Sequence, residues 1–215
     1  MQVTYLGHAS FKIESDGKTI YVDPWLNGPT SPIKVDDVTE VDICLVTHDH
    51  GDHGYAEAVE ICKKTGATFV AINELALKAK EDGVENVHTL NIGGSVEVGG
   101  VIVTLVQAFH SSSIGTPTGF VVTLPSGTFY HSGDTGLFYD MKLFGELQRG
   151  SYYVMGIEEA VKATELVGPK VVVPMHYDTF PAIAANPKQF YQKVTDKGKT
   201  KVEIMKPGDV KKIDL

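Results

Sequence analysis

The features that mark a membrane or secreted protein are missing from this sequence. No apolar run approaches the roughly 20 residues that a bilayer-spanning helix needs. The opening segment, MQVTYLGHAS, lacks the basic stretch followed by an apolar stretch that is typical of a signal peptide. We therefore expect a cytoplasmic protein that does not enter a membrane.

Cysteine is scarce as well, since the chain contains two, Cys44 and Cys62. Two thiols are too few for a disulfide framework. Cys44 falls in an apolar segment and Cys62 in a predicted helix, which favours two buried thiols in a reducing compartment. A single disulfide or a thiol ligand to a metal is the alternative.

Positive charge is in short supply. The chain has 19 Lys and Arg against 27 Asp and Glu, and its formal net charge is −8. This balance argues against non-specific binding to nucleic acid or to anionic membranes, for which a basic face is expected. It leaves an anionic small substrate open, because divalent cations in a site would reverse the local sign of the charge.

The chain has 215 residues, which fits one large domain or two small ones and is long enough to bury a hydrophobic core. Turn signals and short apolar segments predict hairpins in the first half, and strands alternate with helices in both halves. This mixture favours an α+β fold with sheets packed on each other and helices outside. Strands are expected at 2–6, 10–14, 19–23, 42–46, 67–72, 86–90, 94–98, 100–107, 118–124, 128–131, 170–175 and 201–205, and helices at 55–65, 74–82, 138–148, 157–167 and 187–196.

Three histidines and two aspartates lie within six consecutive positions, 48–53, directly after an apolar segment. Imidazole nitrogens and carboxylate oxygens bind zinc-class cations at about 2.0–2.2 Å. His48 and His50 are two residues apart and so share one face of an extended segment. Gly51 permits a turn that brings Asp52 and His53 back towards them. The cluster indicates a metal site.

Three further residues of the same types follow apolar segments, namely His110, Asp134 and His176. A single histidine at a strand end is more often a satisfied polar residue than a ligand. With the 48–53 cluster present, however, seven groups of ligand type are available. That number suits two cations held roughly 3.5–4 Å apart, as in two-metal hydrolytic sites.

The segment THDHGDH resembles the HxHxDH signature of the metallo-β-lactamase superfamily, and His110, Asp134 and His176 match the order and spacing of that family. The segments YLGHASF, QAFHS, YHSGDTG and VVVPMHY resemble a branch of metal-dependent hydrolases similar to the L-ascorbate phosphate lactonase. The resemblance covers nearly the whole chain. It implies a four-layer αββα sandwich, with residues 1–215 forming a single hydrolase domain.

The resemblance also implies the roles of the ligands. His48, His50 and His110 would hold one metal, Asp52, His53 and His176 would hold the other, and Asp134 would bridge them. A hydroxide between the ions would be the nucleophile, and Asp52 would orient it or pass a proton to the leaving group. We expect two divalent ions, with Zn²⁺ first, although His and Asp ligands also suit Mn²⁺, Fe²⁺ and Ni²⁺.

Residues around this cluster allow two interpretations each. His131 is either a catalytic or supporting residue or a buried strand histidine. For His8, the resemblance suggests a place near the active-site mouth, in a supporting or substrate-binding role. Asp23 either hydrogen-bonds the ligand loop from behind or is a simple turn residue. Asp49 should point away from the metals, and the small polar loop 111–119 either moves over substrate or is a connector.

The family usually has a further short buried strand before the helix predicted at 157–167. Here the expected apolar segment is absent, because Arg149 is followed directly by Gly150 at the place where it would stand. Either the protein lacks this strand or residues are missing from the sequence at this point. We expect the second, because the loss of a core strand is costly.

The leading function is hydrolysis of an ester, lactone or phosphoester bond in a small substrate. A phosphodiesterase or nuclease acting on RNA or cyclic nucleotides is the alternative, although the acidic charge counts against it. A non-catalytic metal-binding protein remains a further alternative. A di-iron redox centre would call for a flavin domain, for which the chain has no room. The substrate, the metal and the formation of a homo-oligomer are left open by the sequence.

Overall fold

The computed structural model describes residues 1–138, 141 and 155–214. The chain divides into two compact units, the first formed by Met1–Gly133 with Lys206–Leu215 and the second by Asp134–Met205. This division leaves the expectation of one hydrolase domain over residues 1–215 as a prediction. Within the described residues, no helix has both the length and the apolar character needed to cross a membrane.

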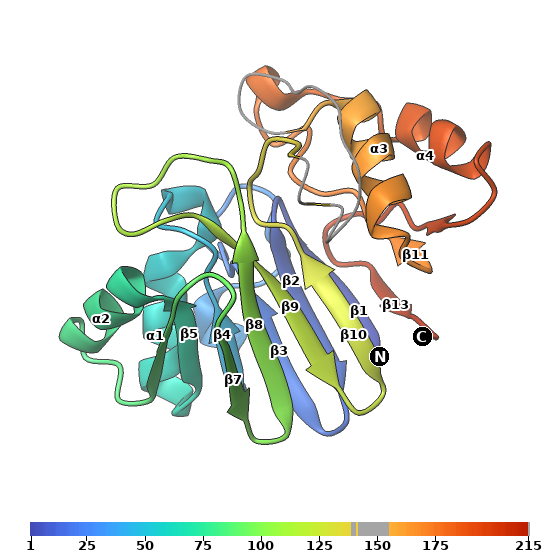
Figure 1. Ribbon diagram of the computed structural model, residues 1–215. Helices are drawn as coiled ribbons and strands as arrows, with labels where there is room; N and C mark the ends of the chain where they lie inside the picture. The colour runs from blue at the N-terminus through green and yellow to red at the C-terminus, as the bar shows by residue number, and fades with distance from the viewer. Residues whose placement is uncertain (139–140, 142–154, 215) are drawn as a thin grey trace. The chain divides into compact units, whose positions relative to one another are not determined.

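The first unit contains a mixed sheet of seven strands (Figure 1). Its first strands pair antiparallel, and the pairs from β3 to β6 are parallel. Asp16 and Gly17, in the hairpin loop between β2 and β3, have φ values of 54° and 71°, as a type I′ turn requires. The order across the sheet is β13 (Val210–Lys212), β1 (Gln2–Gly7), β2 (Ser10–Ser15), β3 (Lys18–Val22), β4 (Ile43–Leu45), β5 (Thr68–Ile72) and β6 (Val87–Leu90).

The strand β13 was not expected, so the prediction that 201–205 is the last strand is wrong. β13 pairs antiparallel with β1, with Val210 opposite Thr4. Its side chains are exposed or half-buried, and its sequence, VKK, has no alternation of apolar and polar residues. Pairing with the edge of the sheet specifies this strand, and local sequence does not.

A second sheet of four antiparallel strands belongs to the same unit. Along β8 the side chains of Val101, Val103 and Leu105 are buried while Ile102 is exposed, so one face of this sheet is in the core. Phe11 of the first sheet contacts His131 of the second, with ring centroids 5.8 Å apart. The sheets therefore pack face to face (Figure 1). The strands of the second sheet are β7 (Ser95–Val98), β8 (Val101–Gln107), β9 (Thr118–Leu124) and β10 (Gly127–His131).

Two helices, α1 (Tyr55–Thr65) and α2 (Asn73–Glu81), pack on β4, β5 and β6, which makes the first unit a helix, sheet and sheet arrangement. Glycine begins and ends α1. Gly54 has φ +67°, and a Cβ on it would stand 2.3 Å from the carbonyl carbon of Pro24. Gly66 has φ +77°, and among the described residues no atom lies within 4 Å of such a Cβ. Two short 3-10 helices, η1 (Val35–Asp37) and η2 (Gly51–His53), interrupt the loops before and after β4.

Asp42, just before β4, is hydrogen-bonded to the first residues of β3. Its carboxylate accepts hydrogen bonds from Lys18 Nζ and from the Thr19 amide, both at 2.8 Å. Burial raises the pKa of Asp42, but these hydrogen bonds outweigh burial, so the pKa lies below its ordinary value.

The second unit holds α3 (Ile157–Val167), η3 (Pro181–Ile183), α4 (Pro187–Thr195) and the parallel pair β11 (Val171–Val172) and β12 (Lys201–Val202). Val161 of α3, Phe190 and Val194 of α4, and Val202 of β12 form one buried cluster of this unit. The strands are shorter than the predicted 170–175 and 201–205. Apart from Phe138 and Met141, the predicted helix over 138–148 falls outside the described residues, as does the question raised at 149–150.

Candidate metal centre

The candidate site of the first unit is built where strands end. β3 and β4 run parallel, so their carboxyl ends lie at the same edge of the sheet. Asp23 follows β3, and Thr47 and His48 come just after β4. His110 comes shortly after the end of β8 in the facing sheet. The ends of strands distant in sequence thus supply the side chains.

His48, His50 and His110 converge. The centroids of the His48 and His50 rings are 4.5 Å apart, and each lies 5.1 Å from the His110 ring. One ring nitrogen from each residue lies within 4.8 Å of the others. Three imidazoles meeting in this way are the protein ligand set of many catalytic zinc sites, which keep a further position open.

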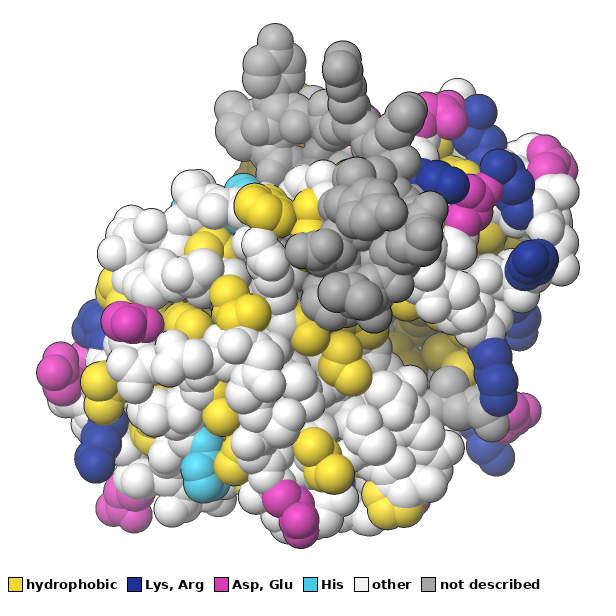
Figure 2. Space-filling view, viewed as in Figure 1, with side chains coloured by type: hydrophobic (Ala, Val, Ile, Leu, Met, Phe, Trp, Pro, Cys, Tyr) yellow, Lys and Arg dark blue, Asp and Glu magenta, His cyan; other side chains and the backbone are white. Residues whose placement is uncertain are grey.

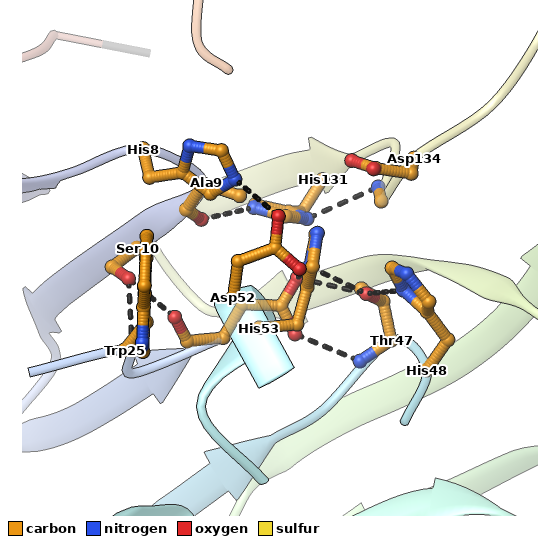
Figure 3. A network of polar contacts seen from close by, with 12 residues as sticks. His8, Ala9, Ser10, Trp25, Thr47, His48, Asp52, His53, His131 and Asp134 are labelled. Atoms are coloured by element: carbon orange, nitrogen blue, oxygen red, sulfur yellow. Dashed lines mark hydrogen bonds and ion pairs between the residues drawn. The ribbon is translucent and has the colours of Figure 1, made fainter. Parts of the chain in front are cut away.

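A second group contains His8, Asp52 and His53 (Figure 3). One ligand-type atom from each lies within 4.8 Å of the others. His8 Nε2 is 3.0 Å from Asp52 Oδ2, and the ring of His53 is 4.1 Å from that of His48, centroid to centroid. Burial raises the pKa of Asp52, but the hydrogen bond with His8 and the charge of His53 outweigh it and hold this pKa well below its ordinary value. Asp52 is therefore a carboxylate at neutral pH.

Asp23 supports the loop that carries these histidines. Its Oδ1 accepts a hydrogen bond from the Thr47 amide at 2.8 Å, and its Oδ2 lies 2.8 Å from Thr47 Oγ1 and 2.7 Å from His53 Nδ1. Burial raises the pKa of Asp23, but the charge and hydrogen bond of His53 outweigh burial and lower it. A buried carboxylate bonded to one histidine nitrogen leaves the other nitrogen to act as a ligand.

Both ring nitrogens of His131 lie within hydrogen-bond distance of backbone groups. Its Nε2 lies 2.9 Å from the Ala9 carbonyl oxygen, and its Nδ1 accepts a hydrogen bond from the Gly133 amide at 3.2 Å. The ring is buried. These contacts favour a structural role, and a catalytic one stays a prediction.

The two remaining predicted ligands belong to the second unit, where they contact each other. His176 Nε2 lies 3.1 Å from Asp134 Oδ2, and Asp134 is buried. His176 has φ +58°, an uncommon value for a residue other than glycine. His8 and Asp23 share this feature, with φ values of 54° and 46°. Left-handed backbone at non-glycine residues is costly and clusters at functional sites.

Two parts of the site were not anticipated from the sequence. Thr47 contacts Asp23, His48 and His53. In the sequence, only its place directly before His48 hints at a role. Asp49 points to the loop after His110, where its Oδ1 accepts hydrogen bonds from Ser112 Oγ at 2.8 Å and the Ser113 amide at 2.9 Å. No residue spacing predicts a contact between segments this far apart.

Comparison with known proteins places the chain in a family. Residues 2–176 match the family model described as beta-lactamase superfamily domain. A relative named UPF0173 metal-dependent hydrolase, from Methanopyrus kandleri, is 48% identical over 227 aligned positions, covering 97% of this chain and 98% of the relative.

Two solved structures resemble the fold. Igni18, a metallo hydrolase from the archaeon Ignicoccus hospitalis, is 40% identical with a TM-score of 0.89, covering 97% of this chain and 96% of its own. The metallo-beta-lactamase fold protein YhfI from Bacillus subtilis is 15% identical with a TM-score of 0.74, covering 97% of this chain and 98% of its own. At this identity the likeness shows the fold alone. The predicted α+β sandwich is confirmed. The chain belongs to the beta-lactamase superfamily and is a metal-dependent hydrolase.

Proposed function

We propose that the protein hydrolyses an ester, lactone or phosphoester bond of a small substrate at a centre of two divalent cations. His48, His50 and His110 would hold one cation, and Asp52 and His53 would contribute to the other. Family resemblance adds His176 to the second cation and Asp134 as a bridge. The observation that carries the proposal is the convergence of the three imidazoles of His48, His50 and His110.

The donor set fits divalent cations of the zinc class. Neutral imidazoles and a carboxylate with a low pKa are the ligand types such ions take. His53 is oriented by the Asp23 carboxylate, as histidine ligands of metals almost always are. Zn²⁺ is our first choice, and Mn²⁺, Fe²⁺ and Ni²⁺ are the alternatives. When bound, such cations lower the pKa of water towards 7 and polarise the oxygen of the scissile bond.

Asp52 and His8 are the residues suited to move protons. The Asp52 carboxylate is about one-third exposed, at 30% of its side-chain surface, while His8 behind it is 1% exposed. Asp52 can therefore accept a proton from water or deliver one to a leaving group. His8 Nε2, at 3.0 Å, holds one carboxylate oxygen and so limits how the group can turn.

The charge distribution agrees with a small substrate. The chain is acidic, and on the face shown in Figure 2 Asp and Glu side chains lie among the described Lys side chains. A nucleic-acid groove would need a continuous basic surface. A lactone or phosphorylated sugar-like compound is the substrate class that the lactonase-like motifs favour.

The test joins metal analysis to a substrate panel. Purified protein is assayed for bound metal, and the metal-loaded enzyme is offered lactones, thioesters, phosphodiesters and β-lactams. We expect about two divalent ions per chain and turnover of a lactone or phosphoester. His48→Gln, His50→Gln and His110→Gln should each lose bound metal, whereas the matched control His88→Gln, at an exposed position in β6, should not.

Turnover isolates the role of Asp52. Asp52→Ala should reduce the rate on the confirmed substrate by a factor of about 10²–10⁴, the usual contribution of a general acid or base. Full activity of Asp52→Ala would refute the assigned role. Metal binding without turnover of any compound would favour the non-catalytic alternative, and hydrolysis of phosphodiesters alone would favour the phosphodiesterase.

A further inference from the structure

Thr47 belongs to the network of polar contacts shown in Figure 3. Its side chain is fully buried between the loop after β3 and the two histidines. The hydroxyl oxygen lies 2.8 Å from Asp23 Oδ2, 3.0 Å from His48 Nδ1 and 3.3 Å from His53 Nδ1. A hydroxyl has one proton to donate and two lone pairs, so these contacts decide where the proton lies.

The proton of the hydroxyl belongs to the contact with Asp23. Two oxygen atoms 2.8 Å apart repel each other unless a proton lies between them, and the carboxylate of Asp23 has none to give. The Thr47 hydroxyl therefore donates to Asp23 Oδ2. Because its only proton is used in this bond, the hydroxyl can act only as an acceptor towards His48 Nδ1, which lies 3.0 Å away. The proton in that contact comes from the nitrogen.

His53 contacts the Asp23 carboxylate without an intervening hydroxyl. Its Nδ1 lies 2.7 Å from Asp23 Oδ2, and this contact too requires a proton on the nitrogen. At a pH where the rings carry no charge, each imidazole has one N–H, so both rings keep a lone pair on Nε2. One carboxylate thus sets the tautomers of two histidines, one by direct contact and one through a hydroxyl.

We propose that Thr47 is a positioning residue that relays the Asp23 carboxylate to His48 and fixes His48 in the Nδ1–H tautomer, with Nε2 presented as the ligand atom. The consequence for metal binding rests on the proposed function, in which His48 and His53 are ligands of two different cations. The tautomer itself does not, because it is a property of the protein without metal.

The decisive measurement is nuclear magnetic resonance of chelator-treated protein with ¹⁵N-labelled histidine. Spectra that correlate ring nitrogens with ring protons distinguish Nδ1–H from Nε2–H. They are recorded about two pH units above the ordinary histidine pKa of about 6.5, so that exposed rings are neutral. We expect the His48 signals, identified from His48→Gln, to show a proton on Nδ1. A proton on Nε2 of His48 in the wild type would overturn the proposal.

Three variants test the hydroxyl. Thr47→Val keeps the shape and removes the relay, so we expect His48 to lose its Nδ1–H preference and metal affinity to fall about 10–100-fold. Thr47→Ser restores the hydroxyl and should keep the wild-type tautomer and affinity. Thr118→Val is the matched control, since Thr118 is equally buried and its hydroxyl donates to the Thr47 carbonyl oxygen, at 3.1 Å, instead of to a carboxylate. It should leave both readouts unchanged.

The outcomes separate this inference from the proposed function. Wild-type tautomer and affinity in Thr47→Val, or equal losses in Thr47→Ser and Thr47→Val, would refute the relay. If Thr47→Val does not fold, the wild-type spectrum and Thr47→Ser still decide the question. A wild-type protein that shows Nδ1–H on His48 but binds no metal would support the relay and refute the proposed metal centre.

Discussion

Replacing Asp23 by alanine or by asparagine should damage the protein in two different ways. The Asp23 side chain is fully buried and accepts from the Thr47 amide, the Thr47 hydroxyl and His53 Nδ1. Asp23→Ala leaves all three without this acceptor. Leaving a buried donor unsatisfied costs about 1–3 kcal/mol, so three such donors cost at least about 3 kcal/mol, which for a domain of this size lowers Tm by at least roughly 6 °C.

Asparagine can fill the same space with the protons reversed. Its carbonyl oxygen can accept from the Thr47 amide, while its NH₂ group donates to Thr47 Oγ1 and to His53 Nδ1. The threonine hydroxyl then donates to His48 Nδ1, and both histidines carry their proton on Nε2. The groups that contact residue 23 stay hydrogen-bonded, so we expect Asp23→Asn to lose less stability than Asp23→Ala. Both ligand nitrogens are blocked, however, so affinity for metal should fall about 10–100-fold at each site.

The assay measures the two quantities separately. Urea unfolding of chelator-treated proteins gives the free energy of unfolding without a contribution from metal. Competition with a chromophoric chelator gives the affinity for metal. Asp42→Asn is the matched control, because it makes the same chemical change at a carboxylate away from the histidines, and it should bind metal as the wild type does. Wild-type metal affinity in Asp23→Asn would refute the proton assignment.

Three further predictions follow from local contacts. Gly66→Ala should cost about 1–2 kcal/mol for its left-handed backbone, whereas Gly54→Ala should cost several kcal/mol more, because its Cβ would stand 2.3 Å from a backbone carbon of a neighbouring loop; urea unfolding measures both. Asp49→Ala should speed hydrogen exchange of the Ser113 amide roughly 10–100-fold, since a hydrogen bond to a charged acceptor contributes about 1.5–3 kcal/mol. The pKa of Asp42 is depressed, so its stabilising contribution is present above the ordinary value near 3.9 and is lost as the pH falls through the lower folded-state value; Asp42→Asn should flatten the acid side of the stability curve.

Each of these has a contrary result. Equal losses in the two alanine variants would show that steric overlap at Gly54 is relieved cheaply. Unchanged protection of the Ser113 amide would mean that the loop after His110 is held by other contacts. An unaltered acid limb in Asp42→Asn would show that its ion pair with Lys18 is screened by solvent, as many exposed pairs are.

Most of the elements of the first unit could be predicted from the sequence. Hairpin signals, short apolar segments and glycine stops act over a few residues, and so they are readable along the chain. The helices Tyr55–Thr65 and Ile157–Val167 have the predicted limits. The strand β13 could not be predicted, because nothing in VKK distinguishes a strand from a loop until the edge of β1 is placed beside it.

The sequence by itself determined the residue types of the candidate centre. Three histidines and two aspartates within positions 48–53 indicate metal chemistry at short range, whatever the rest of the chain does. Only the tertiary structure decided which groups support them. His8 meets Asp52 across 44 positions, and Asp23 meets Thr47 across 24. Such contacts depend on which strand ends lie at the same edge of a sheet, and hydrogen bonding of this range leaves no periodic trace in the sequence.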